Sequence, residues 1–284
     1  MKGVILAAGE GTRMQSVTYG AFPKELLPIG NVPTIRFPIE AMRLAHVRNI
    51  LVVIARQTKH GIIDGLEGGK KFDTSICYVV QERNLTGSRG MGQAILSTKD
   101  WIEEGQDLVV ACGDSILCDF GLSNPLDCLK PLLKIHSSSN ALATVLAYPS
   151  RASPARFGIV RFASLREDGV TPYGELDDLV EKPDLARVRD YQLRGYYFVI
   201  AGYYVFKSKI FQYIEKTEPD ANNEVQITDA ISLALKKEKV VAVVHGRFEH
   251  ECICPFDYWD VGIPEEYKAA NKRVLEANLE SFMI

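Results

Sequence analysis

Uninterrupted apolar runs alternate with amphipathic stretches through the first half of the chain. The runs predict buried strands, at residues 3–8, 49–55, 75–81 and 107–112. The amphipathic stretches predict helices, at residues 33–45, 58–66 and 92–104. Strands that are apolar throughout and separated by helices are typical of a parallel sheet covered on both faces. The pattern therefore predicts a doubly wound α/β layer, whose ligands bind beyond the carboxyl ends of the strands.

The second half of the chain has a different pattern. Strand-like segments follow one another with turn signals such as Glu167-Asp168-Gly169, at residues 141–147, 158–162, 174–181 and 196–206. Helical patterns return afterwards, at residues 209–215, 226–238 and 264–279. These strands predict an inserted antiparallel or mixed sheet. No linker rich in Pro, Ser or Gly separates the halves, so we expect a single domain over residues 1–284.

The composition narrows the class of protein. Of the 284 residues, 46% are hydrophobic and 24% charged, which excludes a disordered chain or a coiled coil. The net charge of −3 provides no basic surface for nucleic acid. No apolar run approaches the ~20 residues that span a bilayer, and the short run at 4–8 does not make a signal peptide. The 6 cysteines lack the paired spacing of a metal site. We expect a cytoplasmic protein that binds neither membranes nor nucleic acid.

A loop of small residues follows the first expected strand, with the sequence Leu6-Ala7-Ala8-Gly9-Glu10-Gly11-Thr12-Arg13. Small residues let backbone N–H groups approach a phosphate closely, and Arg13 adds a permanent charge. Met14 stands where a dinucleotide-binding loop needs a third glycine, which disfavours a nucleotide-cofactor oxidoreductase. The loop is a candidate phosphate site, and a plain strand-to-loop turn is the alternative.

Lys24 is a second candidate phosphate ligand. Pro23 precedes it and restricts the local backbone, which would aim the ammonium group. Arg13 and Lys24 on one long loop could clamp a polyphosphate, although two solvated surface charges would give the same pattern.

Two aspartates are candidate metal ligands. Asp114 follows the expected strand 107–112, at the edge of the sheet where the first loop also ends. Mg²⁺ takes one or two protein carboxylates together with substrate phosphates, so Asp114 suits it. Asp260, in Tyr-Trp-Asp-Val-Gly, is the second candidate. Either carboxylate could instead stabilise a turn or cap a helix.

Glu181 and Lys182 form a third group of charges. Neighbours on a regular strand point to opposite faces, but we expect Pro183 to end the strand and let both side chains reach one pocket. Lys182 suits a monophosphate and Glu181 suits sugar hydroxyls. An exposed ion pair on an edge strand is the alternative.

Taken together, the motifs resemble sugar-1-phosphate nucleotidylyltransferases, in particular the glucose-1-phosphate uridylyl- and thymidylyltransferases. They occur in that family's order over roughly residues 1–270, at 6–13, 22–29, 113–114, 157–160, 181–183, 201–206, 223–230 and 259–262. The resemblance implies a Rossmann-like mixed sheet of the GT-A type. It also implies Mg²⁺-dependent reaction of a nucleoside triphosphate with a sugar 1-phosphate, giving a nucleotide-sugar and pyrophosphate. The displacement is in line and needs no general base.

The resemblance also implies a role for each matching residue. Arg13 would hold the β- and γ-phosphates, Lys24 the α-phosphate and the incoming sugar phosphate, and Lys182 the sugar phosphate. Asp114 and Asp260 would hold Mg²⁺. The nucleotide would be lined by Leu6, Ala7, Ala8, Gly9, Gly11, Thr12, Gln81, Gly90 and Gly113, of which Gln81 and Gly90 would meet the base. The sugar would face Gly158, Glu181 and Gly202.

The resemblance leaves the nucleotide open. Pro23-Lys24-Glu25 and 223–230 favour the uridylyl type, whereas the compact length and Val80-Gln81 favour the thymidylyl type, and the spacer 82–89 is longer than usual. Residues 1–120 would form the nucleotide half, 141–262 the sugar-phosphate half and 263–284 a C-terminal helix. A homodimer or homotetramer is implied. A non-catalytic regulatory homologue is the alternative, disfavoured because the charged residues are all retained.

Overall fold

The computed structural model describes residues 1–55, 59–81, 87–152, 154, 156–166, 171–184, 188–249 and 252–278. The expected turn at 167–169, the start of the helix expected at 58, the end of that expected at 279 and most of the spacer 82–89 lie outside these residues. The chain divides into two compact units, each described below by itself. The first comprises Met1–Glu82, Val110–Leu129 and Asp257–Ile284, and the second Arg83–Val109 and Lys130–Phe256.

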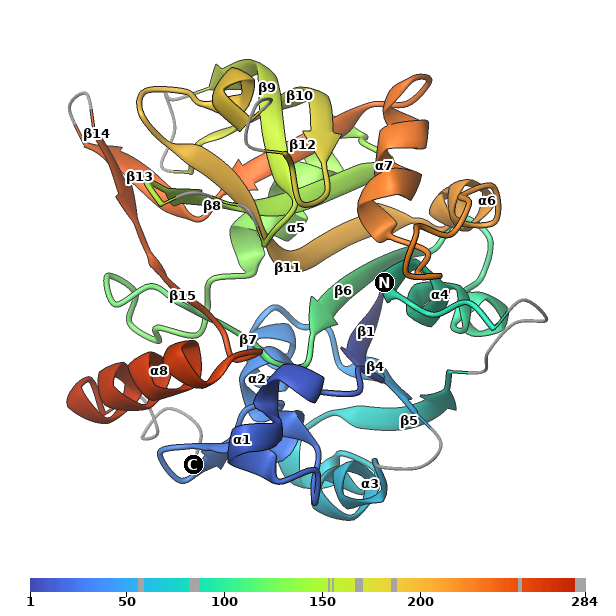
Figure 1. Ribbon diagram of the computed structural model, residues 1–284, viewed down its shortest axis with the longest axis vertical. Coiled ribbons are helices and arrows are strands. Elements are labelled where there is room, and N and C mark those ends of the chain that lie inside the picture. Colours follow the sequence, from blue (N-terminus) through green and yellow to red (C-terminus); the bar gives the residue numbers. More distant parts are fainter. Residues whose placement is uncertain are drawn as a thin grey trace. The chain divides into compact units, whose positions relative to one another are not determined.

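The first unit contains the parallel strands that the apolar runs predict (Figure 1). Strand β1 (Lys2–Ala7) pairs in parallel with β4 (Asn49–Ile54), which pairs in parallel with β5 (Ser75–Val80). The order is β5-β4-β1-β6, where β6 is Asp107–Cys112. Helices α2 (Arg36–Leu44) and α3 (His60–Leu66) lie between these strands in sequence, at the expected places. The α/β prediction is confirmed for this unit.

A second, two-stranded sheet of the first unit joins distant parts of the chain. Strand β7 (Ser115–Cys118) pairs antiparallel with β15 (Asp257–Asp260), and helix α8 (Pro264–Glu276) follows. Their apolar side chains pack with α2 in one core, made of Ile29, Phe37, Ile116, Cys118, Leu126, Trp259, Val261, Ala270 and Val274. The remaining elements are short, namely η1 (Thr12–Met14), α1 (Gln15–Thr18), η2 (Lys24–Leu26), β2 (Pro28–Ile29), β3 (Val32–Pro33) and η3 (Lys70–Phe72).

The second unit is built on a mixed sheet. Strand β6 begins in this unit and is followed in the sheet by β11-β8-β12-β10-β9. These strands are β8 (Ala143–Ser150), β9 (Ile159–Arg166), β10 (Tyr173–Val180), β11 (Tyr197–Lys207) and β12 (Val240–Val244). The β12–β8 pair is parallel, while the pairs β11–β8, β10–β12 and β10–β9 are antiparallel. The predicted mixed sheet is therefore confirmed. Strands β13 (Gly246–Glu249) and β14 (Cys252–Pro255) pair antiparallel in a separate two-stranded sheet.

The helices of the second unit depart from the expected pattern in two places. The single helix expected over 92–104 is wrong, because α4 (Met91–Leu96) is followed by a separate turn, η4 (Lys99–Trp101). The hydroxyls of Ser97 and Thr98 donate to the carbonyls of Gln93 and Ile95 at 3.0 and 2.7 Å, which competes with continued helix. Helix α5 (Lys130–Ser139) was not expected. The others are η5 (Val188–Tyr191), η6 (Ser208–Ile210), α6 (Phe211–Ile214) and α7 (Ile227–Leu235).

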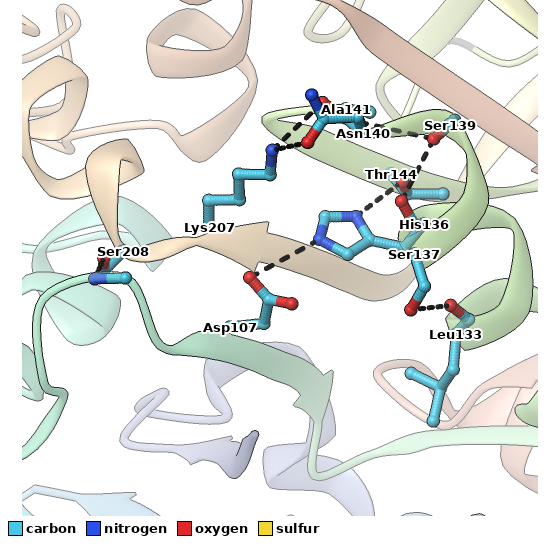
Figure 2. A network of polar contacts seen from close by, with 11 residues as sticks. Asp107, Leu133, His136, Ser137, Ser139, Asn140, Ala141, Thr144, Lys207 and Ser208 are labelled. Carbon is cyan, nitrogen blue, oxygen red and sulfur yellow. Dashed lines mark hydrogen bonds and ion pairs between the residues drawn. The ribbon is translucent and has the colours of Figure 1, made fainter.

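A buried polar network ties α5 to the sheet of the second unit (Figure 2). The His136 ring is 1% exposed and its Nδ1 lies 2.8 Å from the Thr144 hydroxyl, while its Nε2 lies 3.9 Å from the Asp107 carboxylate. The Lys207 ammonium donates to the carbonyl of Asn140 at 3.1 Å. The network therefore links β6, α5, β8 and β11. In the described part of the chain, no helix has the length and apolar character needed to cross a bilayer.

Candidate functional site

The loop after β1 has the shape that the glycine pattern predicts. Gly11 has φ of 68°, in the left-handed region that favours glycine, and its carbonyl accepts from the amide of Met14 at 2.9 Å. Ala7 ends β1, Ala8 and Gly9 follow in the loop, and Thr12 begins η1. A Cβ on Gly11 would lie 3.7 Å from the Lys24 side chain, so the loop lies against the stem of that lysine.

Gly113 brings the end of β6 close to the end of β1. Its amide donates to the carbonyl of Leu6 at 2.9 Å, and a Cβ there would lie only 3.1 Å from the same oxygen. Any larger residue would push the two strand ends apart. The predicted meeting of the first loop and the Asp114 strand is thus present in the first unit.

Lys24 and Asp114 form an ion pair within the first unit. The Lys24 ammonium donates to Asp114 Oδ2, and the two side chains are only 17% and 11% exposed. Burial disfavours both charges, but the attraction between them is stronger. It holds the pKa of Asp114 below its ordinary value, while Asp114 and Glu25 hold the pKa of Lys24 above its own. Both groups are therefore charged at neutral pH.

Asp260 lies beside Asp114, although the two are far apart in the sequence. The pairing of β15 with β7 sets Asp260 opposite Ser115, and the amide of Val261 donates to the carbonyl of Asp114 at 2.9 Å. Burial and the Asp114 charge raise the pKa of Asp260 to about 6, against the attraction of Lys24 and Arg13. Two carboxylates are thus held close together, with two cations of the loop acting on one of them.

The pair of aspartates fits a divalent magnesium ion. Burial, and after it the neighbouring Asp114 carboxylate, raise the pKa of Asp260, and a bound cation would offset both effects. Both donors are oxygen, which Mg²⁺ prefers, and it commonly takes few protein ligands together with waters and substrate phosphates. Among the described residues, no group of three or more His, Cys, Asp or Glu side chains could hold a metal ion by itself. Substrate oxygens and water would therefore complete the coordination.

No thiol nucleophile accompanies these charges. Cys112 is next to Gly113, but burial and the charges of Asp114 and Asp260 raise the pKa of its thiol far above the ordinary value. The neutral thiol of Cys112 is therefore favoured over the thiolate, which is the nucleophilic form. Cys77, Cys112, Cys118, Cys128 and Cys254 form no disulfide bond.

Sequence reasoning missed a second ion pair behind Lys24. Lys59 Nζ lies 2.6 Å from Glu25 Oε2, and these side chains are 2% and 1% exposed. Glu25 stood inside the Pro-Lys-Glu motif, but no pattern marked Lys59, which precedes α3 as its N-cap residue. A lysine at the start of an amphipathic helix is usually solvated, so only the fold reveals this contact.

The second unit brings Glu181 and Lys182 together, by a different route from the one expected. β10 ends at Val180, before Pro183, and Lys182 has φ of 43°, which turns the backbone sharply. Lys182 Nζ then lies 3.6 Å from Glu181 Oε1. The amide of Lys182 donates to the carbonyl of Phe157 at 3.2 Å, which fixes the turn. The charged ends of Glu181 and Lys182 therefore lie together in the second unit.

Gly158 and Thr228 frame the Glu181 carboxylate. A Cβ on Gly158 would lie 2.9 Å from Glu181 Oε2 and 3.0 Å from a methyl group of Thr228. The Thr228 hydroxyl donates to the same carboxylate oxygen at 3.2 Å. Burial raises the pKa of Glu181, against the attraction of Lys182. Thr228 was not among the predicted site residues, although it lies in the Asn-Glu-Val-Gln-Ile-Thr-Asp motif.

The structure places the other predicted residues separately. Gly202 has φ of 68° and lies where the register of β11 against β8 shifts, between Ile200 and Tyr204. Gly90 has φ of 103°, and a Cβ there would lie 2.8 Å from the carbonyl of Val225. Gln81 follows β5 in the first unit, where its amide donates to the carbonyl of Ile54 at 2.8 Å. Asp260, which the sequence grouped with residues 141–262, belongs to the first unit.

These features are the ones expected of a site that binds phosphate compounds. A glycine loop, two basic side chains and two carboxylates meet at the carboxyl ends of parallel strands, where α/β folds bind their ligands. A family of proteins described as nucleotidyl transferase matches residues 2–277. The chain therefore belongs to the nucleotidyl transferase family.

Individual relatives agree with this assignment. A low-salt glycan biosynthesis nucleotidyltransferase of Haloferax volcanii is 29% identical over 278 residues, which cover 97% of this chain and 66% of that protein. The glucose-1-phosphate thymidylyltransferase of Neisseria meningitidis is 30% identical over 249 residues, or 87% of this chain and 75% of that protein. The solved structure of a UDP-glucose pyrophosphorylase complexed with UDP-glucose has a TM-score of 0.76 at 24% identity, covering 97% of this chain and 98% of that one. This last likeness shows a shared fold.

Proposed function

We propose that the protein transfers a nucleotidyl group from UTP or dTTP to glucose 1-phosphate or a related hexose 1-phosphate, releasing pyrophosphate. The observation that carries this proposal is the Lys24–Asp114 pair with Asp260 beside it, next to a glycine loop. The Neisseria meningitidis relative is named for the thymidylyl version of this reaction, which supports the substrate class.

The proposed reaction forms one bond and breaks another. An oxygen of the sugar phosphate attacks the α-phosphorus, and the bond from that phosphorus to the bridging oxygen of the β-phosphate breaks in line. The attacking oxygen is already ionised at pH 7, so no general base is needed. The residues assigned to the reaction, Arg13, Lys24, Asp114 and Asp260, include no hydroxyl or thiol nucleophile paired with a histidine. Catalysis then depends on holding two anions together and balancing their charge.

In this proposal Lys24 and Arg13 each hold a different pair of phosphates. Lys24 holds the α-phosphate and the incoming phosphate, where charge develops during the displacement. Arg13 is exposed beside the loop and holds the β- and γ-phosphates that leave as pyrophosphate. The backbone of Leu6, Ala7, Ala8, Gly9, Gly11, Thr12 and Gly113 lines the nucleotide.

Asp114 and Asp260 are the residues that would hold Mg²⁺. When bound, the ion supplies positive charge to the phosphate oxygens. Lys24 stays charged while it contacts Asp114, because its pKa lies above the ordinary value. The protein's own part is to keep two carboxylates and one ammonium in fixed positions before substrate arrives.

The second unit contributes the groups assigned to the sugar phosphate. Lys182 binds the phosphate, and Glu181 accepts hydrogen bonds from sugar hydroxyls while Thr228 holds one of its oxygens. Gly202, which has no Cβ, adopts the left-handed conformation at that point of β11. Gln81 and Gly90 are assigned to the base. We further propose that the protein is cytoplasmic and works as a homodimer or homotetramer.

The test is a substrate matrix. UTP, dTTP, CTP and GTP are each combined with several hexose 1-phosphates, with Mg²⁺ and with excess EDTA, and pyrophosphate release is measured. We expect release with UTP or dTTP and glucose 1-phosphate or a close analogue, and none in EDTA. Release with no combination would end the proposal. Light scattering of the same preparation gives the number of subunits.

A further inference from the structure

The Lys59–Glu25 ion pair needs an explanation that stability does not supply. Its two side chains are 2% and 1% exposed, and the charged atoms lie 2.6 Å apart. Moving two charges out of water costs roughly as much as their attraction returns, and apolar residues of similar size often serve stability better. The role of the pair therefore depends on the charged residues around it.

The pair lies directly behind the Lys24–Asp114 contact. Glu25 follows Lys24 on η2, and a Cβ on Gly113 would lie 3.2 Å from its Cγ. Glu25 is thus packed against the backbone that precedes Asp114. Four charges, two positive and two negative, alternate within one buried cluster of the first unit.

The Lys24 ammonium is attracted by two carboxylates. Both Asp114 and Glu25 attract its ammonium, and Asp114 does so more strongly. Glu25 accepts a hydrogen bond from the Lys59 ammonium, which balances the charge of the Glu25 carboxylate. If Lys59 were neutral, Lys24 would be the remaining cation known to act on the buried Glu25 carboxylate. An uncompensated buried carboxylate is costly, so Glu25 would either take up a proton, which burial already favours by raising its pKa, or draw the Lys24 ammonium away from Asp114. Only the second outcome moves Lys24, and it is the one that the inference concerns.

We propose that Lys59 is a positioning residue, which neutralises Glu25 so that the Lys24 ammonium stays on Asp114 and on the substrate phosphates. For its activity readout the inference rests on the proposed function. Lys59 touches neither metal nor substrate in this scheme and acts through Glu25 and Lys24.

The backbone around η2 is held independently of this pair. The amide of Ile35 donates to the carbonyl of Glu25 at 2.9 Å, and the Thr34 hydroxyl donates to the carbonyl of Leu27 at 2.8 Å. Leu26 packs over α3, since a Cβ on Gly61 would lie 3.1 Å from it. Loss of Lys59 should therefore change where Lys24 points while the segment keeps its place.

The experiment is a cycle of three variants, namely Lys59→Met, Glu25→Gln and the double variant. Lys59→Met should lower kcat at least about tenfold, and Glu25→Gln should lower it less, because Lys24 then has no second carboxylate. The double variant should be faster than Lys59→Met alone. KM for the sugar phosphate should change little. A merely structural role predicts no such recovery of kcat among folded molecules, whose fraction is measured by circular dichroism.

The exposed pair of Lys71 and Glu67 is the matched control. Its charged atoms lie 3.0 Å apart, but the side chains are 47% and 70% exposed. Lys71→Met, Glu67→Gln and their double variant should leave kcat unchanged. Where Lys59→Met does not fold, Lys59→Gln removes the charge and retains a donor for Glu25.

Two results would overturn the inference: a double variant as slow as Lys59→Met, or a Glu25→Gln variant that is slower than both. A wild-type protein without any activity would instead refute the proposed function. In that case the crystal structure of Lys59→Met decides the inference. It predicts the Lys24 ammonium on Glu25, and an ammonium still on Asp114 refutes it.

Discussion

The amide of Val261 donates a hydrogen bond of 2.9 Å to the carbonyl of Asp114. This bond extends the pairing of β7 with β15, and it sets two carboxylates from opposite halves of the sequence side by side. The proposed cation site thus depends on the pairing of two short strands, and the role of each of its residues can be tested separately.

Asp114→Asn should nearly abolish activity while preserving the fold. The amide keeps the size of the carboxylate but loses its charge, so it pairs poorly with Lys24 and with a divalent cation. We expect kcat to fall about 100- to 1000-fold, the usual effect of losing one preorganised electrostatic group. Pyrophosphate release across a Mg²⁺ titration is the measurement. Asp64→Asn, at an exposed position of α3, is the control, and equal losses in both variants would contradict the assignment.

Lys24→Met should lower kcat more than it raises KM for the nucleotide. Lys24 is assigned to phosphates at which charge develops, whereas Arg13 and the loop backbone remain to bind the triphosphate. A loss confined to KM would show that Lys24 contributes only to binding. Because Asp114 loses its partner, the variant should also be less stable, which urea unfolding measures. The exposed Lys70→Met is the control for both readouts.

Gly158→Ala should weaken the sugar phosphate selectively. The new methyl group would lie 2.9 Å from Glu181 Oε2, so the carboxylate must shift from its position. Overpacking of this kind costs about 1–3 kcal/mol of stability. We expect a higher KM for the sugar phosphate and an unchanged KM for the nucleotide. Gly68→Ala, where nothing lies within 4 Å of the new atom, should change neither. Equal effects on both substrates would refute the separation of roles.

His136 should make the stability of the protein sensitive to mild acid. Burial lowers the pKa of its ring from the ordinary 6.5, against the attraction of Asp107 and with the Lys207 charge acting in the same sense as burial (Figure 2). Below pH 6.5 the unfolded chain binds a proton that the folded protein resists. The free energy of unfolding therefore falls as the pH drops below 6.5 towards the lower pKa that His136 has in the folded protein. Above pH 6.5 the full contribution of the neutral ring to stability is present.

Urea unfolding between pH 5 and pH 8 measures this dependence. His136→Gln should remove part of the slope below pH 6.5, because glutamine does not titrate. His60→Gln, at an exposed position of α3, should leave the slope as it is. If His136→Gln and the wild type have the same slope, His136 is not the group responsible.

The sequence predicted most of the strands and helices that depend on the local pattern of apolar and polar residues. Strands β1, β4, β5 and β6 are apolar throughout, and their order with the helices between them indicates a parallel sheet. Helix α5 was not predicted, because Ser137 to Asn140 form a polar patch in the sequence, although Pro131 suits the first turn of a helix. Strand β12 was also not predicted, although its five apolar residues, Val240–Val244, are typical of a buried strand.

The site was less accessible to prediction than the fold. Asp114 follows a clear strand, so its place at the sheet edge could be inferred. Asp260 and Lys59 depend on contacts between segments that are distant in the sequence, and no periodicity encodes such contacts. The meeting of Glu181 and Lys182 follows from a positive φ at Lys182, which a sequence of Glu-Lys-Pro does not announce.

The first unit is assembled from three separated stretches of chain, and the last of them begins at Asp257. During synthesis, at about 5–20 residues per second, the ribosome delivers Lys24 and Asp114 well before Asp260. A nascent chain that stops short of β15 also lacks Trp259 and Val261, which complete the core around Phe37 and Ile116. Translation must therefore pass β15 before the pair of carboxylates exists, so a product that ends before Asp257 has neither this core nor the proposed cation site.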